Sequence, residues 1–453
     1  MRFYERSTAM NKSQEILAVE SESLPSSSRI KYFDMVIDHG KGALLYDVDG
    51  REYIDFLASA SSANTGHCHP KVVAAIQKQA TQLIHYTPAY YANPVNSSLL
   101  TRLAALAPGD FPKKVAVGIS GSDANDAMIK FSRGYTGRSY IICFTGAYHG
   151  STYGSITLSN VSLNMSRKIG PLLPNVVKMP FPDSHKMLPN ESQEDFVARM
   201  WQAFMEPFET WLPVEEVAGV IIEGIQGDGG IIACPKAYME KLYAFTRTHG
   251  IVFAVDEINQ GFGRSGKMWA IDHFDIAPDL MSIGKSVASG MPFSALIGRT
   301  EIMESLDAPA HVFTTAGNPV CAAAAHATLD VIEEEKLVER SERLGKIAAR
   351  FFERMQKTYD FVGDVRMYGL DGGIDIVSAD KTPDVAATTK IIAELFKLGV
   401  IMISLRGNIL RFQPPLVITD EQLNTGLSKV EQAFEAYQNN EITLPKDHQK
   451  IGW

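Results

Sequence analysis

Short apolar runs that end in polar residues recur through the middle of the chain and constrain its fold most. They cover residues 115–119, 140–144, 217–222, 251–255, 280–283 and 293–297, and helical patterns lie between several of them. Strands that are apolar along their whole length are buried on both faces. The alternation therefore predicts an α/β fold, with a mostly parallel sheet covered by helices on both sides.

The pattern changes after Pro319, where we expect a separate, smaller α+β domain. It should hold one long helix to about residue 359, strands over 365–377, a helix over 385–398, an extended pair and a last helix from Asp420. A hairpin predicted over 42–56, turning at Asp49-Gly50, belongs with it. We expect a loose arm at 1–28, a segment joining the small domain at 29–64, a large domain at 65–325 and the small domain at 326–453. Met10 is an alternative start.

Composition excludes several functions for these 453 residues. The net charge of −9 argues against binding to nucleic acid or to anionic membrane surfaces. No apolar run approaches the roughly 20 residues that span a bilayer, and the N-terminus lacks an apolar signal core. The four cysteines have no framework spacing. We therefore expect free thiols and a cytoplasmic protein.

Polar residues follow four of the predicted strands. Ser120-Gly121-Ser122, Glu223, Asp256 and Lys285 should meet at the carboxyl edge of the sheet, where ligands bind in such folds. A lysine at the mouth of a core is costly unless it is used or neutralised. Pyridoxal phosphate needs both an amine, for a Schiff base, and a carboxylate, which keeps its pyridine nitrogen protonated.

Each of these residues also has a simpler interpretation. Ser120-Gly121-Ser122 starts a predicted helix and would suit an anion, but Ser is also an ordinary N-cap. Tyr148 could stack on a planar cofactor or pack in the core. Asp256 could meet a pyridinium or an Arg or Lys of the same chain. His67-Cys68-His69 has no second Cys/His cluster, so we expect no metal.

Ordered motifs from about residue 41 to 416 carry a family resemblance. The chain resembles the class III aminotransferase family of fold-type I pyridoxal-phosphate enzymes, through Gly66-His67-Cys68-His69-Pro70, Ser120-Gly121-Ser122-Asp123-Ala124, Ala147-Tyr148-His149-Gly150, Asp256-Glu257-Ile258-Asn259, Gly284-Lys285, Thr314-Thr315-Ala316-Gly317-Asn318-Pro319 and Arg411-Phe412-Gln413-Pro414-Pro415-Leu416. The resemblance implies an aspartate-aminotransferase-like fold. It also implies a homodimer, or a tetramer built as a dimer of dimers, with active sites at the interface.

The resemblance also implies residue roles. Lys285 would form the internal aldimine and Arg411 would bind a substrate carboxylate, which its bidentate fork suits. Asp256 would pair with the pyridine nitrogen of the cofactor and Tyr148 would stack on its ring. Its phosphate would be bound by Gly121 and Ser122, and by Thr314 from the neighbouring subunit. Many members contact the phenolic oxygen with Gln, where this chain has Asn259.

Asp228 is the informative departure from the family pattern. Asp228 lies in the motif Gly227-Asp228-Gly229-Gly230. Many members have Glu at this place, and that Glu pairs with the arginine matching Arg411. Asp is one methylene shorter, so we expect a weaker or absent pair. The racemase branch of the family carries Asp here. Ser59-Ala60-Ser61, residues 85–90, residues 307–311 and residues 450–453 also resemble that branch.

The branch implies racemisation or epimerisation at Cα of aliphatic amino acids, such as L-isoleucine to D-allo-isoleucine. Lys285 would remove the α-proton, a quinonoid would hold the charge, and Asp228 would be the acid–base partner on the opposite face of Cα. Asp228 could instead only position the ring or cap a turn. Tyr86 could line an apolar substrate pocket or pack at the dimer interface.

Three other functions are weighed against this one. An ω- or 4-aminobutyrate-type aminotransferase would share the cofactor but need a keto-acid acceptor. A non-catalytic cofactor-binding protein should lack part of the constellation, which is complete here. An NAD enzyme should carry a Gly-x-Gly-x-x-Gly motif after a strand, and the chain has none in that place.

Overall fold

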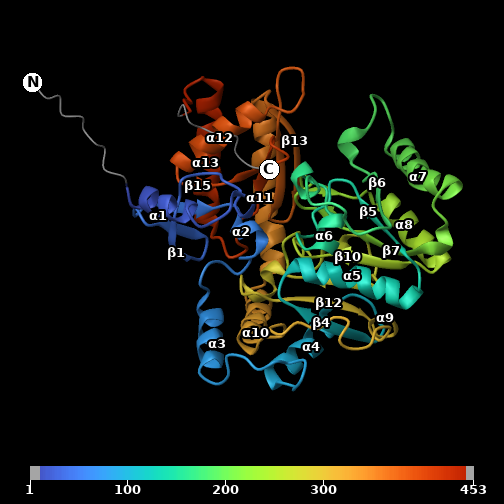
Figure 1. Cartoon of the computed structure of the whole chain (residues 1–453). Helices are drawn as coiled ribbons and strands as arrows, with labels where there is room; N and C mark the ends of the chain where they lie inside the picture. Colours follow the sequence, from blue (N-terminus) through green and yellow to red (C-terminus); the bar gives the residue numbers. More distant parts are fainter. Residues whose placement is uncertain (1–10, 445–453) are drawn as a thin grey trace, which may run out of the picture.

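The structure, a computed structural model, describes residues 11–444. Three sheets of four or more strands and one two-stranded sheet form its framework (Figure 1). The central seven-stranded sheet has the order β4 (Lys113–Gly118), β12 (Ser294–Arg299), β11 (Leu280–Ile283), β10 (Val252–Asp256), β7 (Val217–Ile222), β5 (Tyr140–Phe144) and β6 (Val176–Met179). Every strand predicted in this region is present.

One strand departs from the parallel pattern. β12 pairs antiparallel with both β11 and β4, whereas the other neighbouring strands pair in parallel. Apolarity predicts burial of a strand but carries no information on its direction.

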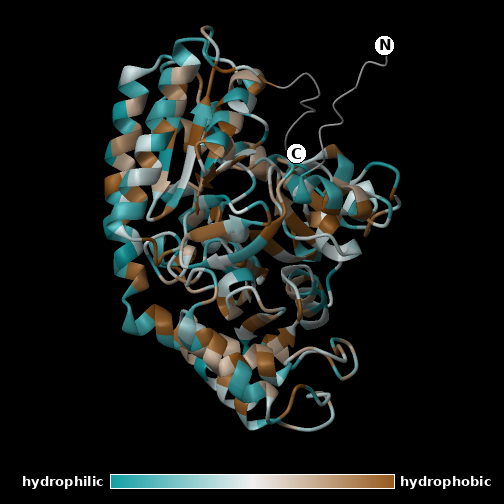
Figure 2. Ribbon diagram, turned by 90° about the vertical axis from the view of Figure 1, so that its left-hand side faces the viewer, coloured by the Kyte–Doolittle hydropathy of each residue, from teal (hydrophilic) through white to brown (hydrophobic). Residues whose placement is uncertain are grey.

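Helices cover both faces of the central sheet. Alternate residues of a strand point to opposite faces. On one face Ile141 and Cys143 pack against α5 (Gly121–Thr136), and on the other Ile142 and Phe144 share a core with the helices that follow β6. Around the sheet lie α4 (Pro94–Leu106), α6 (Tyr153–Leu158), α7 (Gln193–Thr210), α8 (Lys236–His249), α9 (Thr300–Met303) and α10 (Pro319–Glu334), and α3 (Pro70–Ala80) packs on α10. Figure 2 shows hydrophobic residues gathered in the inner strands, while the outer helices alternate in character.

The C-terminal part combines a four-stranded antiparallel sheet with three helices, which agrees with the expected α+β character. Its sheet has the order β13 (Val362–Tyr368), β14 (Asp371–Ile376), β17 (Ile409–Phe412) and β16 (Ile403–Leu405), and its helices are α11 (Leu337–Thr358), α12 (Val385–Lys397) and α13 (Asp420–Gln438). The single helix expected from residue 322 to 359 is wrong. It is broken between α10 and α11, where Lys336 adopts a left-handed conformation with φ of +50°.

The N-terminal segment joins this part through a third sheet. The predicted hairpin consists of β2 (Leu44–Asp47) and β3 (Glu52–Asp55), preceded by β1 (Ile37–Lys41). β3 pairs in parallel with β15 (Val400–Ile401), so segments 346 residues apart lie side by side in Figure 1. The domain boundaries themselves remain predictions.

The arm expected at residues 1–28 contains a helix where it is described. Residues 1–10 lie outside the described part, as do residues 450–453. Residues 12–21 form α1 (Lys12–Ser21), which has a capping box at Asn11. The Ser13 hydroxyl donates to Asp49 at 2.5 Å and so fastens the helix to the β2–β3 hairpin. Reciprocal capping satisfies exposed backbone groups that a polar sequence would otherwise leave to water.

Candidate active site

A cavity of about 160 Å³ lies at the carboxyl ends of the central strands. It gathers seven of the predicted site residues, and its lining consists of Gly121, Ser122, Asn125, Tyr148, His149, Gly150, Glu223, Asp228, Asp256, Ile258, Asn259 and Lys285. The position agrees with the rule that α/β sheets bind ligands beyond their carboxyl edges.

The N-terminus of α5 forms one wall of the cavity. Ser120 is the N-cap and accepts a hydrogen bond from the Asp123 amide, while Gly121 and Ser122 line the cavity. The N-cap interpretation therefore holds for Ser120, while phosphate binding by Gly121 and Ser122 stays a prediction. A Cβ at Gly121 would lie 2.8 Å from Ile258 Cδ1, so a larger residue here would force the Ile258 side chain to move. Free amides of the first turn and the helix dipole suit a phosphate.

Asp256 lies at the end of β10 in a dense hydrogen-bond network. Its Oδ2 accepts from Asn125 Nδ2 at 2.7 Å and pairs with His149 Nδ1 at 2.7 Å, while Oδ1 accepts from the Ile258 amide. Burial acts to raise the pKa of Asp256, but the bond to His149 and its charge outweigh it and lower that pKa. The carboxylate is thus held ionised, as a protonated pyridine nitrogen requires.

Asn125 and His149 are site residues that the sequence reasoning did not assign. Burial acts to lower the pKa of His149, yet Asp256 raises it overall. Asn125 follows Gly121 by one helical turn, so it faces the same side of α5. His149 stands beside Tyr148 in a quoted motif. The positions of both residues in the sequence could therefore have indicated that they belong to the site.

Lys285 is separated from the end of β11 by Gly284 and is left-handed, with φ of +45°. Within residues 11–444, no hydrogen bond joins its Nζ to another residue. Burial lowers the pKa of Lys285, opposed by the charge of Asp228. Burial therefore favours the neutral amine, the form that attacks a carbonyl.

Asp228 and Arg411 form a buried ion pair, which contradicts the expected weak pairing. Arg411 Nη1 donates to Asp228 Oδ1 at 2.8 Å, and Arg411 is 2% exposed. The turn that carries Asp228 approaches β17 closely enough to compensate for the missing methylene. Gly373 pairs with Arg411 in the sheet, and a Cβ on Gly373 would lie 2.6 Å from the Gly230 carbonyl oxygen.

Two other polar side chains hold the Arg411 guanidinium. Its Nε donates to Gln413 Oε1 at 2.6 Å and its Nη2 to Asn259 Oδ1 at 3.3 Å. Asn259 thus lines the cavity while bonded to Arg411, and its contact with a cofactor stays a prediction.

Glu223 is a second carboxyl in the cavity wall. It accepts hydrogen bonds from the Gly227 amide at 3.1 Å and the Tyr148 amide at 3.4 Å. Burial raises the pKa of Glu223 to about 7, opposed by the charge of His149. The sequence placed Glu223 at the sheet edge but gave it no role.

A left-handed turn connects the N-terminal segment to the site. Residues Ala58 to Ser61 of α2 (Ala58–Ser61) have φ values of +48°, +51°, +55° and +68°. Ser61 Oγ donates to the Asn259 carbonyl at 2.9 Å and accepts from Arg264 Nε at 3.1 Å. Left-handed non-glycine residues cost roughly 1–2 kcal/mol each, and such strain gathers at functional sites. Without a glycine, the sequence gave no sign of this turn.

Three predicted site residues do not line the cavity of the single chain. Arg411 lies behind Asp228, Thr314 is exposed, and Tyr86 is 58% exposed. Of the candidate metal ligands, His67 pairs with Asp55 at 2.7 Å and His69 with Glu335 at 2.9 Å. Across residues 11–444, no three His, Cys, Asp or Glu side chains gather as a metal site.

The residues fit pyridoxal phosphate. Lys285 offers an amine without a hydrogen bond in the described chain, Asp256 an ionised carboxylate, and α5 an anion site, all on one cavity. These groups match the three functional ends of the cofactor.

Comparisons with known proteins agree with this fit. The class-III aminotransferase family matches residues 26–434. The chain is 58% identical to isoleucine 2-epimerase of Lentilactobacillus buchneri, over 98% of this chain and 99% of that protein, and 38% identical to leucine/methionine racemase of Thermococcus litoralis, over 93% and 95%. An (S)-enantioselective omega-transaminase from Thermomicrobium roseum superposes with a TM-score of 0.87 at 26% identity, covering 94% of this chain and 99% of that one.

Fold and site together define a fold-type I enzyme that uses pyridoxal 5′-phosphate. The chain belongs to the class III aminotransferase family, and the resemblance to its racemase branch is confirmed.

Proposed function

We propose that this enzyme inverts Cα of aliphatic amino acids, converting L-isoleucine to D-allo-isoleucine and acting on other nonpolar amino acids. The observation that carries the proposal is the carboxyl of Asp228, which shares one cavity with the Lys285 amine. Inversion needs proton exchange on both faces of Cα, and these two groups supply it. The 58% identity to an isoleucine 2-epimerase supports the same reaction.

Each residue then has a defined task. Pyridoxal phosphate, when bound, supplies an electron sink for the charge left at Cα. Gly121 and Ser122 hold its phosphate, Asp256 its pyridine nitrogen, and Tyr148 its ring face. Lys285 Nζ moves the proton on one face of Cα, and an oxygen of Asp228 moves it on the other.

Arg411 connects substrate binding to the state of Asp228. The guanidinium that would bind the substrate carboxylate is the one that now bonds Asp228. A substrate carboxylate competes for this donor. Its binding releases Asp228 from the ion pair.

The alternative is an ω- or 4-aminobutyrate-type aminotransferase, and one assay separates the two functions. Holoenzyme is incubated with L-isoleucine without keto acid, and the products are resolved by chiral chromatography. The proposal predicts D-allo-isoleucine, with solvent deuterium at Cα. No D product, together with keto acid formed only when pyruvate or 2-oxoglutarate is added, would establish the aminotransferase.

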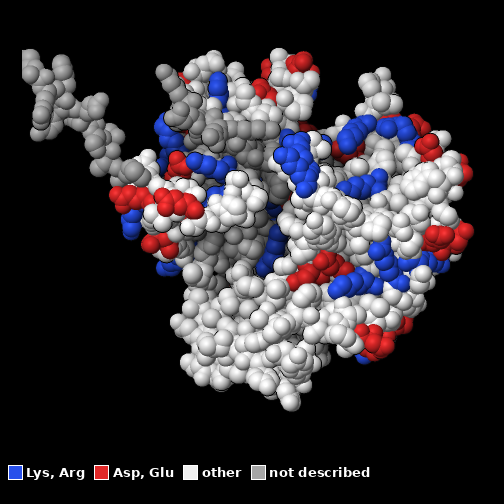
Figure 3. Space-filling model, in the orientation of Figure 1, with Lys and Arg blue, Asp and Glu red and all other residues white. Residues whose placement is uncertain are grey.

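A second copy of the chain completes the site in this proposal. Exposed apolar side chains gather on and near the loop between α3 and α4, including Ile84, Tyr86, Tyr90 and Tyr91, which are 58–76% exposed. Figure 3 shows few charged residues over the lower part of the molecule, where α3, α4 and α10 lie in Figure 1. Such a surface suits a subunit interface, across which Thr314 would reach the partner's phosphate. Sedimentation of the holoenzyme should give a dimer or a dimer of dimers, and a monomer would contradict this.

We also propose that the enzyme works in the cytoplasm. All four cysteines are free, and only Cys68 is exposed. None of the helices within residues 11–444 is long and apolar enough to cross a membrane.

A further inference from the structure

The turn that carries Asp228 is not held in place by its own backbone alone. It links the short strands β8 (Ile225–Gln226) and β9 (Ile232–Ala233). Ile231, just past the turn, has φ of +57°, an unfavourable conformation for a β-branched residue. Such a conformation persists only where surrounding contacts over-determine it.

Two arginines of the C-terminal part bind the carbonyls of this turn. Arg366, on β13, donates from Nε to the Gly230 oxygen at 3.0 Å, and Arg406 donates from Nη1 to the Gly229 oxygen at 3.4 Å. Arg366 is 7% exposed, and Asp375 and Asp364 bind its other nitrogens at 2.5 and 2.8 Å. Hydrogen bonds to three different groups fix the orientation of the Arg366 guanidinium.

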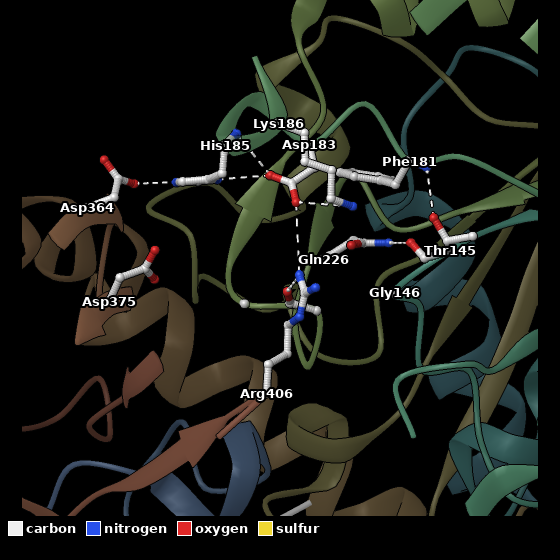
Figure 4. Close-up of polar contacts among 12 residues, drawn as sticks. Thr145, Gly146, Phe181, Asp183, His185, Lys186, Gln226, Asp364, Asp375 and Arg406 are labelled. Atoms are coloured by element: carbon white, nitrogen blue, oxygen red, sulfur yellow. Dashed lines mark hydrogen bonds and ion pairs between the residues drawn. The ribbon is translucent and has the colours of Figure 1, made fainter. Parts of the chain in front are cut away.

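His185 ties the same cluster to the segment after β6. It lies in a 3₁₀ turn (Ser184–Lys186), with Nδ1 2.9 Å from Asp183 and Nε2 2.5 Å from Asp364 (Figure 4). The charged groups that face it are Asp183, Asp364, Arg366, Lys186 and, through Asp183, Arg406. Gln226 completes the attachment by donating to the Thr145 carbonyl at 3.0 Å.

We propose that Arg366, Arg406 and His185 form a clamp that positions the Asp228 turn for proton transfer. These are positioning residues: they act through the backbone at Gly229 and Gly230 and touch neither cofactor nor substrate. The inference rests on the proposed function and adds to it the residues that determine the position of Asp228.

The test compares hydrogen exchange at Cα of the two enantiomers in deuterated water. In Asp228→Asn, Lys285 still exchanges the proton of one enantiomer, and exchange of the other should stop. Arg366→Met should slow exchange of that same, Asp228-dependent enantiomer by about tenfold, as for a misplaced acid–base group, and leave the other within about twofold. Cofactor absorbance should match wild type, and Arg366→Lys should recover part of the rate.

Matched variants keep the test decisive. Arg354→Met removes an Arg–Glu pair of comparable length that joins α11 to α13 instead of the turn, and should leave both exchanges unchanged. Arg406→Met repeats the test at a half-exposed position if Arg366→Met fails to fold. Equal slowing of both enantiomers, or no slowing, would overturn the clamp. Full racemisation by Asp228→Asn would instead overturn the proposed role of Asp228, so the two failures are distinguishable.

Discussion

The two ends of the cavity are built in different ways. The Asp256 end comes from neighbouring strands of one sheet and helix α5, with Asn125 and His149 bonded directly to the carboxylate. The Asp228 end joins three distant segments: the β8–β9 turn, Arg411 on β17, and Ser61 in the left-handed turn. The first end suits a constant cofactor, and the second can vary with the reaction, as loops on a scaffold commonly do.

The cofactor end should be least tolerant of change. Lys285→Ala removes both the covalent anchor and one proton-transfer group. Racemisation should fall by at least about 10³-fold, within the range for loss of an acid–base group. Turnover is measured with added cofactor in excess. Activity within tenfold of wild type would exclude Lys285 as the essential base.

Asp256→Asn should come next in effect. The amide cannot hold a pyridinium by charge, so the rate should fall by roughly 100-fold, comparable to loss of one preorganised electrostatic contact. The His149 pKa should fall at the same time, because Asp256 raises it. Turnover and an NMR titration of His149 measure the two effects. An unchanged His149 titration would show that the pair is not formed.

Arg411→Lys probes the substrate end. A lysine keeps the charge but loses the fork that binds Asp228 and Asn259 together. Loss of one charged hydrogen bond, about 1.5–3 kcal/mol, should raise KM for isoleucine roughly tenfold or more. Cofactor affinity should not change. Weakened cofactor binding instead would mean that the two ends are not independent.

His185→Asn should have the smallest effect, and one that depends on pH. The pKa of His185 is raised to about 9 by its bonds to Asp183 and Asp364, from an ordinary value of 6.5. The stability it contributes is fully present below about pH 6.5 and is lost as pH rises through 9. Tm of the variant should lie a few degrees below wild type at pH 6 and converge with it near pH 10. A difference independent of pH would show that His185 contributes no charged interaction.

The same contrast explains what the sequence could predict. The strands, and the cluster of Gly121, Asp256 and Lys285 at their ends, follow from local apolar runs and their order. The Asp228–Arg411 pair was misjudged because side-chain length says nothing of how closely two backbones approach, and glycines at 230 and 373 set that approach. The left-handed turn at Ala58–Ser61 likewise depends on tertiary bonds rather than local preference.

The proposed racemisation rests most directly on Asp228, and one paired measurement tests it. Asp228→Asn and Glu223→Gln each neutralise a buried carboxyl in the same cavity wall, so Glu223→Gln is the matched control. Formation of D-allo-isoleucine from L-isoleucine, without keto acid, is measured for both. If Asp228 transfers the second proton, Asp228→Asn should lose about 100-fold or more and Glu223→Gln should retain racemisation. Full racemisation by Asp228→Asn, with loss in Glu223→Gln, would contradict this role and assign the second proton to Glu223.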